Sequence, residues 1–275
     1  MPADAGLDGG KSAADSSADA DGASASAQTL PVIWNAPGNV GALMSTRQGG
    51  TSRGAYDSLN LGDRVGDDPA AVAANRERWS GLMWPARPLW LRQVHGAVVV
   101  EASTALRAAD SPQADGCWTR EPGVACVVQV ADCLPVLMAA ANGRAVGAAH
   151  AGWRGLAAGV LERTAEAVAQ AAGCELEALS CWFGPCIGPR QFEVGADVLQ
   201  AFGAAERFFT PRPRPDGQPR WLADLSGLAR QRLQALGVHR VTGGHWCTVE
   251  TPSDFFSFRR DGVTGRMAAA VWLRG

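Results

Sequence analysis

Apolar residues recur along this chain in short runs that predict both strands and helices. Residues 124–138 form a near-continuous, valine-rich run, which is typical of a buried strand. An Asn-Gly pair at 142–143 predicts a tight hairpin turn, so 145–149 is expected to return as the partner strand. Between 156 and 171 the apolar positions recur at helical spacing, and Gly173 stands where such a helix should end.

The rest of the chain adds a second helix and further strands. The apolar spacing over 223–236 predicts a helix that Gly237 would end, whereas the proline-rich segment 211–219 predicts a loop. Residues 89–100 have the composition of a strand, and 255–273 predicts a strand, a turn and a final strand. Because strands and helices do not alternate strictly, we expect an α+β fold in layers rather than a doubly wound sheet.

The first 28 residues differ in composition from the rest of the chain. They are mainly Ala, Ser, Asp and Gly, with almost no large apolar side chain. Such a segment cannot bury enough apolar surface to offset the entropy that ordering would cost. We therefore expect residues 1–28 to be a disordered, low-complexity tail and 29–275 to form a single domain.

Composition and charge narrow the class of protein. The formal net charge of −2 gives no reason to expect a surface for nucleic acid or membrane, and no apolar run approaches the length of a membrane span. The 7 cysteines include no Cys-x-x-Cys pair, which favours a reducing compartment over a disulfide framework. The N-terminus lacks the basic and apolar regions of a secretory signal, so we expect a cytoplasmic protein.

Two of the 4 histidines and one cysteine, His95, Cys133 and His150, lie in unusual stretches rich in small residues. Two imidazoles and a thiolate are the three protein ligands of a zinc site whose fourth position is left for water. They are equally the parts of a cysteine nucleophile with a histidine base. Both interpretations predict an enzyme, with 29–275 as its catalytic domain. The stretches read Gln-Val-His-Gly at 93–96, Ala-Asp-Cys-Leu-Pro at 131–135 and His-Ala-Gly-Trp-Arg-Gly at 150–155.

The predicted hairpin turn also predicts how two of these residues lie. A two-residue turn pairs Ala141 with Arg144 and therefore sets His150 opposite Pro135. Cys133 and His150 then become diagonal neighbours on one face, with backbones about 7–8 Å apart, a distance that a shared metal ion can bridge. A slip of one residue would put the two side chains on opposite faces.

Other polar stretches are candidates for binding an anion or a sugar. Arg154 lies where a predicted helix begins, and free backbone N–H groups there could bind an anion together with the guanidinium. The segments 47–52 and 56–62 combine glycines with Arg47, Ser, Thr and Asn60, groups that suit a phosphate or a sugar hydroxyl. Ordinary helix caps and loops contain the same residues, so a purely structural role is the alternative for each.

A second arginine cluster lies near the C-terminal end, where Arg259 and Arg260 precede Arg266 in a predicted turn. The alternative to an anion-binding role for this cluster is an ordinary charged hairpin tip. We expect Cys186 to be a structural thiol in a tight loop, and the two remaining histidines to be structural as well.

Together these stretches resemble the family described as laccase-domain or polyphenol oxidase proteins, also called the peptidoglycan editing factor and purine nucleoside phosphorylase family. The resemblance extends over about 31–275, with the stretches in family order. It implies a layered α/β sandwich with mixed β-sheets flanked by helices. One departure is Phe258, where the family usually has a tyrosine, so a hydroxyl is missing. The matching stretches are 47–62, 93–96, 131–135, 150–155, 184–188 and 257–266.

The resemblance also implies a zinc ion bound by His95, Cys133 and His150. Members phosphorolyse adenosine, inosine and methylthioadenosine and deaminate adenosine, so we expect a purine nucleoside and phosphate as partners. Cys133 would then belong to the catalytic centre, where a carboxylate that is not a ligand moves the proton. Asp132 is the nearest candidate for that role, and Asp115 is a weaker one.

For phosphorolysis the chain must also hold phosphate near the ribose. We expect Arg47, Arg154 and Arg260 to be the candidates, with Arg47 close to the reaction and Asn60 as a further substrate-binding residue. Which arginine binds the phosphate, which nucleoside is preferred and whether the chain forms oligomers stay open at this point.

Three other functions are alternatives for this set of residues. A laccase needs a trinuclear copper cluster, and 4 histidines cannot supply its ligands, so we exclude a multicopper oxidase. A cysteine amidase that edits cell-wall precursors would use Cys133 as thiolate with His150 or His95 as base. A non-enzymatic zinc protein would need a fourth ligand, for which Cys186 is the candidate.

Overall fold

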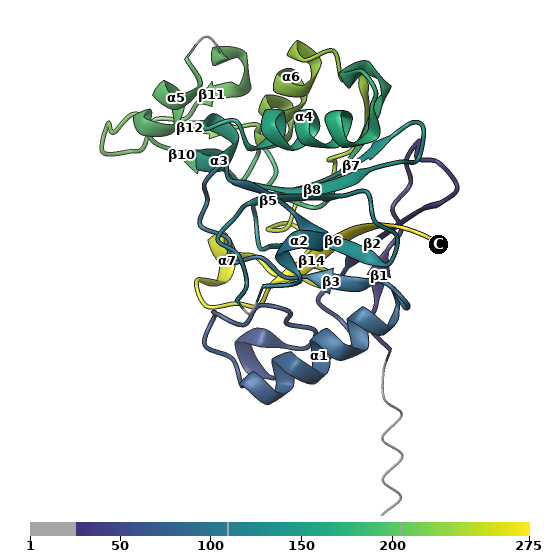
Figure 1. The fold of residues 1–275 in the computed structure, drawn as a ribbon. Coiled ribbons are helices and arrows are strands. Elements are labelled where there is room, and N and C mark those ends of the chain that lie inside the picture. Colours follow the sequence, from purple (N-terminus) through teal and green to yellow (C-terminus); the bar gives the residue numbers. More distant parts are fainter. Residues whose placement is uncertain (1–25, 109, 204) are drawn as a thin grey trace, which may run out of the picture.

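Two mixed β-sheets stack face to face and carry helices on their outer sides (Figure 1). The computed structural model describes residues 26–108, 110–203 and 205–275. The helices α4 (Val160–Ala172) and α6 (Leu225–Ala235) cover one sheet, and α1 (Pro69–Gly81) packs on the far side of the other. The expected α+β fold, a layered α/β sandwich with mixed sheets flanked by helices, is confirmed.

The sheet beneath α1 has 5 strands in the order β1-β2-β14-β6-β3. Its neighbours are antiparallel except β3 and β6, which run parallel. The strands are β1 (Thr29–Leu30), β2 (Val40–Ser45), β14 (Met267–Leu273), β6 (Val124–Val130) and β3 (Arg87–Leu89).

The sheet beneath α4 and α6 has 6 strands in the order β13-β9-β7-β8-β5-β4, with parallel pairs at both of its edges. A third, 3-stranded sheet in the order β10-β12-β11 lies beside it near α5. The large sheet contains β13 (Arg240–Gly243), β9 (Leu179–Phe183), β7 (Leu134–Ala140), β8 (Val146–Ala151), β5 (Gly116–Thr119) and β4 (Val99–Glu101). The small one contains β10 (Glu193–Val194), β12 (Trp221–Ala223) and β11 (Phe209–Pro211).

Short helices complete the chain between these strands. They are α2 (Ala102–Ala105), α3 (Trp153–Ala157), α5 (Ala196–Phe202) and α7 (Phe258–Asp261), with 3-10 turns at Gly54–Tyr56, Leu176–Ala178 and Glu206–Phe208. Within the three described ranges, no helix has the length and hydropathy that crossing a membrane requires.

The strand β7 lies in the centre of the sandwich and explains why its sequence is apolar throughout. Val136 and Met138 pack towards the helices, whereas Leu137 and Ala139 pack into the interface between the two sheets. Side chains alternate between the faces of a strand, so a strand covered on both faces needs apolar residues at every position. The hairpin β7–β8 has the expected register, with Pro135 opposite His150.

Two expected strands are wrong in extent. The run 124–138 is not one strand, because the chain leaves the first sheet after Val130, turns at Asp132 with φ 89°, and enters the second sheet at Leu134. The segment 89–100 is likewise interrupted, since β3 ends at Leu89 and His95 has φ 60°. Both interruptions place candidate site residues in loops at the edge of the sandwich.

Two other expected elements are corrected at their ends. The expected helix over 156–171 is split at Gly159, which has φ 90°, although its expected end at Gly173 is confirmed by φ 63°. The strand expected at the start of 255–273 is instead an irregular segment at 255–257 followed by the helix α7, because the Ser257 hydroxyl accepts the Arg260 N–H and caps that helix.

The remaining predictions concern the second long helix, the proline-rich segment and the tail. The helix α6 begins after Asp224, whose carboxylate accepts the Gly227 N–H, and it ends before Gly237 as expected. Most of 211–219 is a loop. Of the expected tail, residues 1–25 lie outside the described residues. Ala27 is buried and the Gln28 N–H donates to the carbonyl of Gln48, so the folded part includes these two.

Candidate metal and anion site

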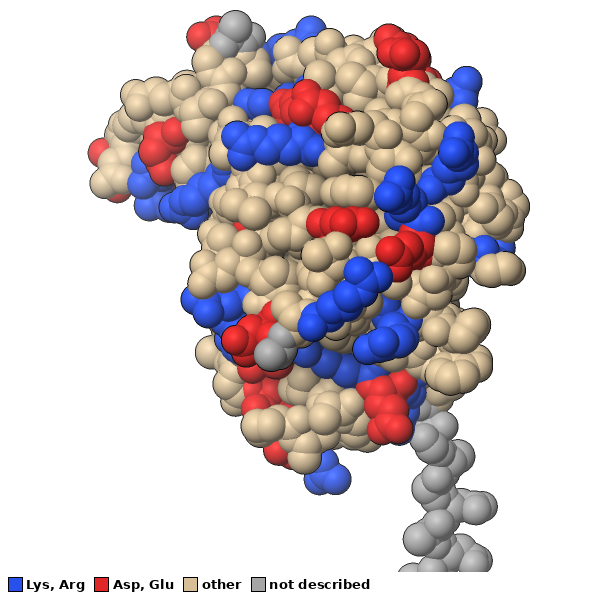
Figure 2. All heavy atoms as spheres, in the orientation of Figure 1, with Lys and Arg blue, Asp and Glu red and all other residues tan. Residues whose placement is uncertain are grey.

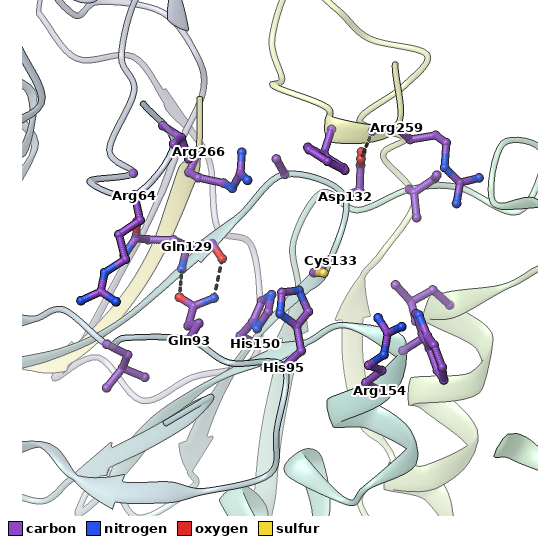
Figure 3. A pocket seen from close by; sticks show the side chains of 18 of the residues that line it. Arg64, Gln93, His95, Gln129, Asp132, Cys133, His150, Arg154, Arg259 and Arg266 are labelled. Atoms are coloured by element: carbon purple, nitrogen blue, oxygen red, sulfur yellow. Dashed lines mark hydrogen bonds between the residues drawn. The ribbon is translucent and has the colours of Figure 1, made fainter. Parts of the chain in front are cut away.

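One imidazole from a strand, one from a loop and a thiol from a strand end meet at the edge of the sandwich. The ligand atoms of His95, Cys133 and His150 all lie within 4.8 Å of one another. His150 belongs to β8, Cys133 directly precedes β7, and His95 lies in the loop between β3 and β4 (Figure 3). His150 is buried, Cys133 is half-buried and His95 is exposed, so the group is accessible from one side.

Unusual backbone conformations bring two residues into this group. His95 with φ 60° and Asp132 with φ 89° are the non-glycine residues of positive φ in the described part of the chain. Such conformations are uncommon for residues with a Cβ and cost free energy, so they persist only where the surroundings hold them. Both interrupt an otherwise extended segment and turn a functional side chain towards the cavity.

Asp115 is the residue that holds the loop of His95 against β8. Its buried carboxylate accepts the backbone N–H groups of Val94, His95 and Gly96 at 3.2, 2.9 and 2.7 Å. The same carboxylate pairs with Nδ1 of His150 at 2.9 Å. With Nδ1 engaged as donor, Nε2 of His150 is left for a metal ion, which is the usual arrangement of a carboxylate behind a histidine ligand. One side chain thus positions two of the three ligands.

The electrostatics of the group favour an ionised thiol. Burial by itself would raise the pKa of Cys133, but the charge and hydrogen bond of His150, together with His95, lower this pKa to about 6. Burial opposes the charged form of His150 as well, yet the charge of Cys133 and the hydrogen bond of Asp115 raise the pKa of His150 to about 9. The pKa of Asp115 is lowered, since its interaction with His150 and the backbone N–H groups outweigh its desolvation.

Asp132 lies beside the thiol and is held in one orientation. Its carboxylate accepts the Thr248 hydroxyl at 2.5 Å and the Arg259 N–H at 2.6 Å, while its carbonyl accepts the Ile187 N–H at 2.9 Å. Two loops and the first turn of α7 therefore converge on this one residue.

A cavity of about 580 Å³ opens over the three candidate ligands. Its wall contains apolar side chains, among them Trp153, Phe192 and Phe258, together with far more positive than negative charge. Such a wall suits a ligand that has both a flat apolar part and an anionic part. The arginines that line it are Arg64, Arg92, Arg154, Arg259 and Arg266, and the acids are Asp63 and Asp132.

Two of these arginines point towards the cluster in Figure 3. Arg266 donates through one terminal nitrogen to the carbonyls of Thr264 and Gly265, both at 3.0 Å, which orients the guanidinium. Its pKa is lowered because it is largely desolvated. Arg154 packs 4.4 Å over the ring of its neighbour Trp153 and is exposed to the cavity.

The structure does not bring the other sequence-predicted residues to this wall. Arg47 donates to the carbonyls of Asp57 and Pro252 and lies 4.6 Å over the ring of Phe256. Asn60 is buried, and its side-chain Oδ1 accepts the N–H groups of Gly62 and Arg266.

Arg260 is held in the same way. Its guanidinium donates to the carbonyls of Thr248, Val249 and Phe255 and pairs with Asp261. Arg47, Asn60 and Arg260 therefore connect the loops that frame the cavity, and Arg266 lies where Arg260 was expected.

No fourth protein ligand accompanies the three candidates within the described residues. Cys186 is buried with a raised pKa caused mainly by desolvation, and its thiol lies 3.6 Å from the carbonyl of Ile187. His245 stacks on Trp246 with ring centroids 3.8 Å apart, away from the cavity wall.

Sequence reasoning undervalued one glycine and one acid. A Cβ on Gly152 would lie 2.8 Å from the sulfur of Cys133 and 3.0 Å from Cδ2 of His95, so this position needs glycine for close approach. The His-Ala-Gly stretch, in which Gly152 directly follows β8, is the sequence signal for it. Asp115, directly before β5, has only the weak signal of an acid that precedes an apolar strand.

Comparisons with known proteins find similar sequences over most of the chain. A family model described as "Multi-copper polyphenol oxidoreductase laccase" matches residues 41–274. A purine nucleoside phosphorylase of Pseudomonas aeruginosa is 49% identical over 244 residues, covering 88% of this chain and 96% of its own length. The purine nucleoside phosphorylase YfiH of Escherichia coli is 46% identical over 241 residues, covering 87% and 96%.

Solved structures give the same result for the fold. A Neisseria meningitidis protein superposes with a TM-score of 0.83 at 46% identity, covering 90% of this chain and 99% of its own. YlmD from Geobacillus stearothermophilus has a TM-score of 0.80 at 32% identity, covering 91% and 100%.

Proposed function

The chain belongs to the family described as multi-copper polyphenol oxidoreductase laccase, and we propose that it is a zinc-dependent purine nucleoside phosphorylase. Relatives that carry the name purine nucleoside phosphorylase support the reaction class. The observation that carries the proposal is the His95, Cys133 and His150 group, open on one side, beneath a cavity rich in arginine. The sequence has only 4 histidines, too few for the trinuclear cluster of a laccase.

The donor set supports zinc as the metal. Two imidazoles and one thiolate are borderline-soft ligands that suit zinc, and three protein ligands with an open side are typical of a catalytic rather than a structural site. The hydrogen bond from His150 to Asp115 leaves the other ring nitrogen available, and the lowered pKa of Cys133 supplies the thiolate. When bound, zinc would supply a Lewis acid that lowers the pKa of a coordinated water to about 7.

We assign phosphate binding to Arg154 and Arg266. Both line the cavity near Cys133, and neither guanidinium is fully occupied by the backbone carbonyls that hold Arg47 and Arg260. In phosphorolysis a phosphate oxygen forms a bond to the ribose C1′ while the bond from C1′ to the purine nitrogen breaks. The two guanidiniums would hold the hydrogen phosphate dianion in place for that attack.

The remaining steps fall to Asp132 and the apolar wall. The departing purine takes the bonding electron pair and needs a proton, which the hydrogen phosphate dianion loses as its oxygen bonds to C1′. We assign the transfer of this proton to Asp132, a carboxylate of the cavity wall that two donors hold in one orientation. Trp153, Phe192 and Phe258 offer flat or apolar surfaces for the purine and keep bulk water away from it.

The substrate range is part of the proposal. From the family resemblance we infer adenosine, inosine and methylthioadenosine as substrates, and adenosine deamination as a second reaction in which water replaces the amino group at C6. We place the protein in the cytoplasm, since its free cysteines suit a reducing compartment.

A cysteine amidase that edits cell-wall precursors is the second candidate. One observation favours it, namely that the pKa of Cys133 is lowered to about 6 beside His150, as in an activated thiol nucleophile. A thiolate bound to a metal ion is not free to attack a carbonyl. Amidase activity that persists after complete removal of zinc would therefore favour this candidate over the phosphorylase.

Product analysis tests the proposed function. Adenosine is incubated with zinc-loaded protein with and without phosphate, and the products are separated by chromatography. We expect adenine only with phosphate, its loss in Cys133→Ala, and its retention in the control Cys174→Ala, whose half-buried thiol lies outside the cavity wall. Inosine in both buffers would indicate deamination instead, and no turnover from zinc-loaded protein would overturn the proposal.

A further inference from the structure

A second hollow, of about 700 Å³, lies beside the cavity and has its own set of arginines. Its wall is formed by β10 and by the hairpin that connects β11 to β12, which is the proline-rich segment of the sequence. Figure 2 shows basic side chains gathered on the part of the molecule where Figure 1 places this small sheet. The proposed phosphorolysis makes no use of the side chains of this surface. Its arginines are Arg212, Arg214, Arg220 and Arg259.

The hairpin places three of these arginines on one face. Pro211 pairs with Trp221 in β12, and the Arg212 N–H donates to the carbonyl of Arg220 at 2.7 Å, so Arg212 and Arg220 lie directly opposite each other. Arg214 follows two residues after Arg212, which returns it to the same face of the strand.

Like charges in directly opposed positions destabilise a hairpin. Prolines at 211, 213, 215 and 219 also restrict the backbone of this segment, so the guanidiniums are presented at low entropic cost. An arrangement that weakens its own hairpin but presents pre-organised cations is suited to an anionic ligand.

The charges inside the hollow do not cancel. Glu193 accepts a hydrogen bond from Arg214 at 2.7 Å and lies 3.9 Å from Nε of Arg220, and Asp197 is the other acid of the wall. Two carboxylates thus face four guanidiniums. The surplus positive charge stands out in a chain whose formal net charge is −2.

Arg259 joins this hollow to the cavity over the candidate ligands, because it lines both. Its backbone N–H donates to Asp132 at 2.6 Å, and its side chain donates to the carbonyls of Gln191 and Glu193 at 3.3 and 3.0 Å. Figure 3 shows the Arg259 guanidinium directed away from Cys133. A ligand that extends past Arg259 would reach from one hollow into the other.

We propose that this second hollow, lined by Arg212, Arg214, Arg220 and Arg259, binds phosphate groups, carried on the substrate as a nucleoside phosphate or nucleoside diphosphate. The phosphate site stands on the arginine geometry alone. Only its link to a nucleoside rests on the proposed function, and free phosphate or pyrophosphate is the other source of the same chemistry.

Isothermal titration of the zinc-loaded, full-length protein with inorganic pyrophosphate tests the site. We expect Arg212→Ala to weaken pyrophosphate binding about tenfold and Arg212→Glu to weaken it further, because a charge-assisted contact is lost and then reversed. The control Arg144→Ala, an exposed arginine at the turn between β7 and β8, should bind as the wild type does. Equal pyrophosphate affinity in the wild type and all three variants would refute the proposed site.

Two further measurements show whether Arg212→Ala changes the stability of the protein and whether the bound phosphate is carried on a nucleoside. Without ligand, Arg212→Ala should unfold at the same temperature as the wild type or slightly higher, since removal of one cation relieves the opposed pair. Adenosine 5′-diphosphate should bind about tenfold more tightly than adenosine, and Arg212→Ala should abolish that difference. Equal binding of the two, with pyrophosphate still dependent on Arg212, would overturn the link to a nucleoside and leave free phosphate as the ligand. The release of adenine from adenosine, which tests the proposed function, does not depend on this result.

Discussion

Replacement of Asp115 probes the centre of the site without touching a ligand atom. Its carboxylate accepts three backbone N–H groups and pairs with Nδ1 of His150, all in a buried position. Asp115→Ala leaves these donors without a partner. Loss of one member of such a buried network costs about 3–5 kcal/mol, so unfolding should occur about 10 °C lower in a protein of this size.

Asp115→Asn separates stability from metal binding. Asparagine keeps one acceptor oxygen for the loop but loses the charge and the second acceptor, so we expect a smaller loss of stability, about 2 kcal/mol. Because His150 is then held less firmly, zinc affinity should fall by about 10- to 100-fold. Competition with a chromophoric chelator measures the affinity, and urea unfolding of the metal-free protein measures the stability.

A matched control comes from another buried polar residue. Asn75 accepts the Thr51 N–H at 2.8 Å and donates to the carbonyls of Ser58 and Asn60, so it also holds a loop from within. Asn75→Ala should lower stability while zinc affinity stays at the wild-type value. Zinc affinity of Asp115→Asn within twofold of the wild type would refute the positioning role and reduce Asp115 to a loop anchor.

Three further predictions follow from individual contacts. In metal-free protein, the rate at which iodoacetamide alkylates Cys133 should rise with pH through a midpoint of about 6, since the thiolate exists above its lowered pKa. His150→Ala should move that midpoint upwards, and a midpoint near 9 in the wild type would contradict this prediction. Gly152→Ala should reduce zinc content at least tenfold, because its Cβ would lie 2.8 Å from the Cys133 sulfur; full zinc content would show that the site relaxes around it. Arg266→Ala should raise the KM for phosphate about tenfold, whereas Arg260→Ala should lower the unfolding temperature and leave that KM unchanged. The reverse pattern in steady-state kinetics would disprove the assignment of phosphate binding to Arg266.

The hairpin that brings Cys133 and His150 together could be predicted because two local rules agree there. The Asn-Gly turn determines which residues face each other, and alternation along a strand determines which side chains share a face. Both depend on residues close in sequence, and the register with Pro135 opposite His150 is the one observed.

The break inside 124–138 could not be predicted in the same way. The strands β6 and β7 are both buried on both faces, so their residues have the same apolar character although they belong to different sheets. The reversal between them depends on the positive φ of Asp132, which tertiary contacts with Thr248 and Arg259 hold in place. Apolar periodicity carries no information about such contacts.

The arginines show a related limit. Arg260 and Arg266 come from one short stretch and have the same side chain, yet Arg260 donates to backbone carbonyls whereas Arg266 reaches the cavity. Which of them is available to a ligand depends on the carbonyls that the fold brings near each one. Sequence patterns predicted the cluster but not which of its arginines line the cavity.

The central claim is that the His95, Cys133 and His150 group holds the metal on which phosphorolysis depends. Its most direct test is a zinc titration of metal-free protein, with adenine release from adenosine measured at saturating phosphate. We predict that activity rises in proportion to added zinc and stops rising at one equivalent per chain, and that Cys133→Ala shows no such rise. Phosphorolysis at full rate in the metal-free protein, or activity that does not depend on added zinc, would contradict the account.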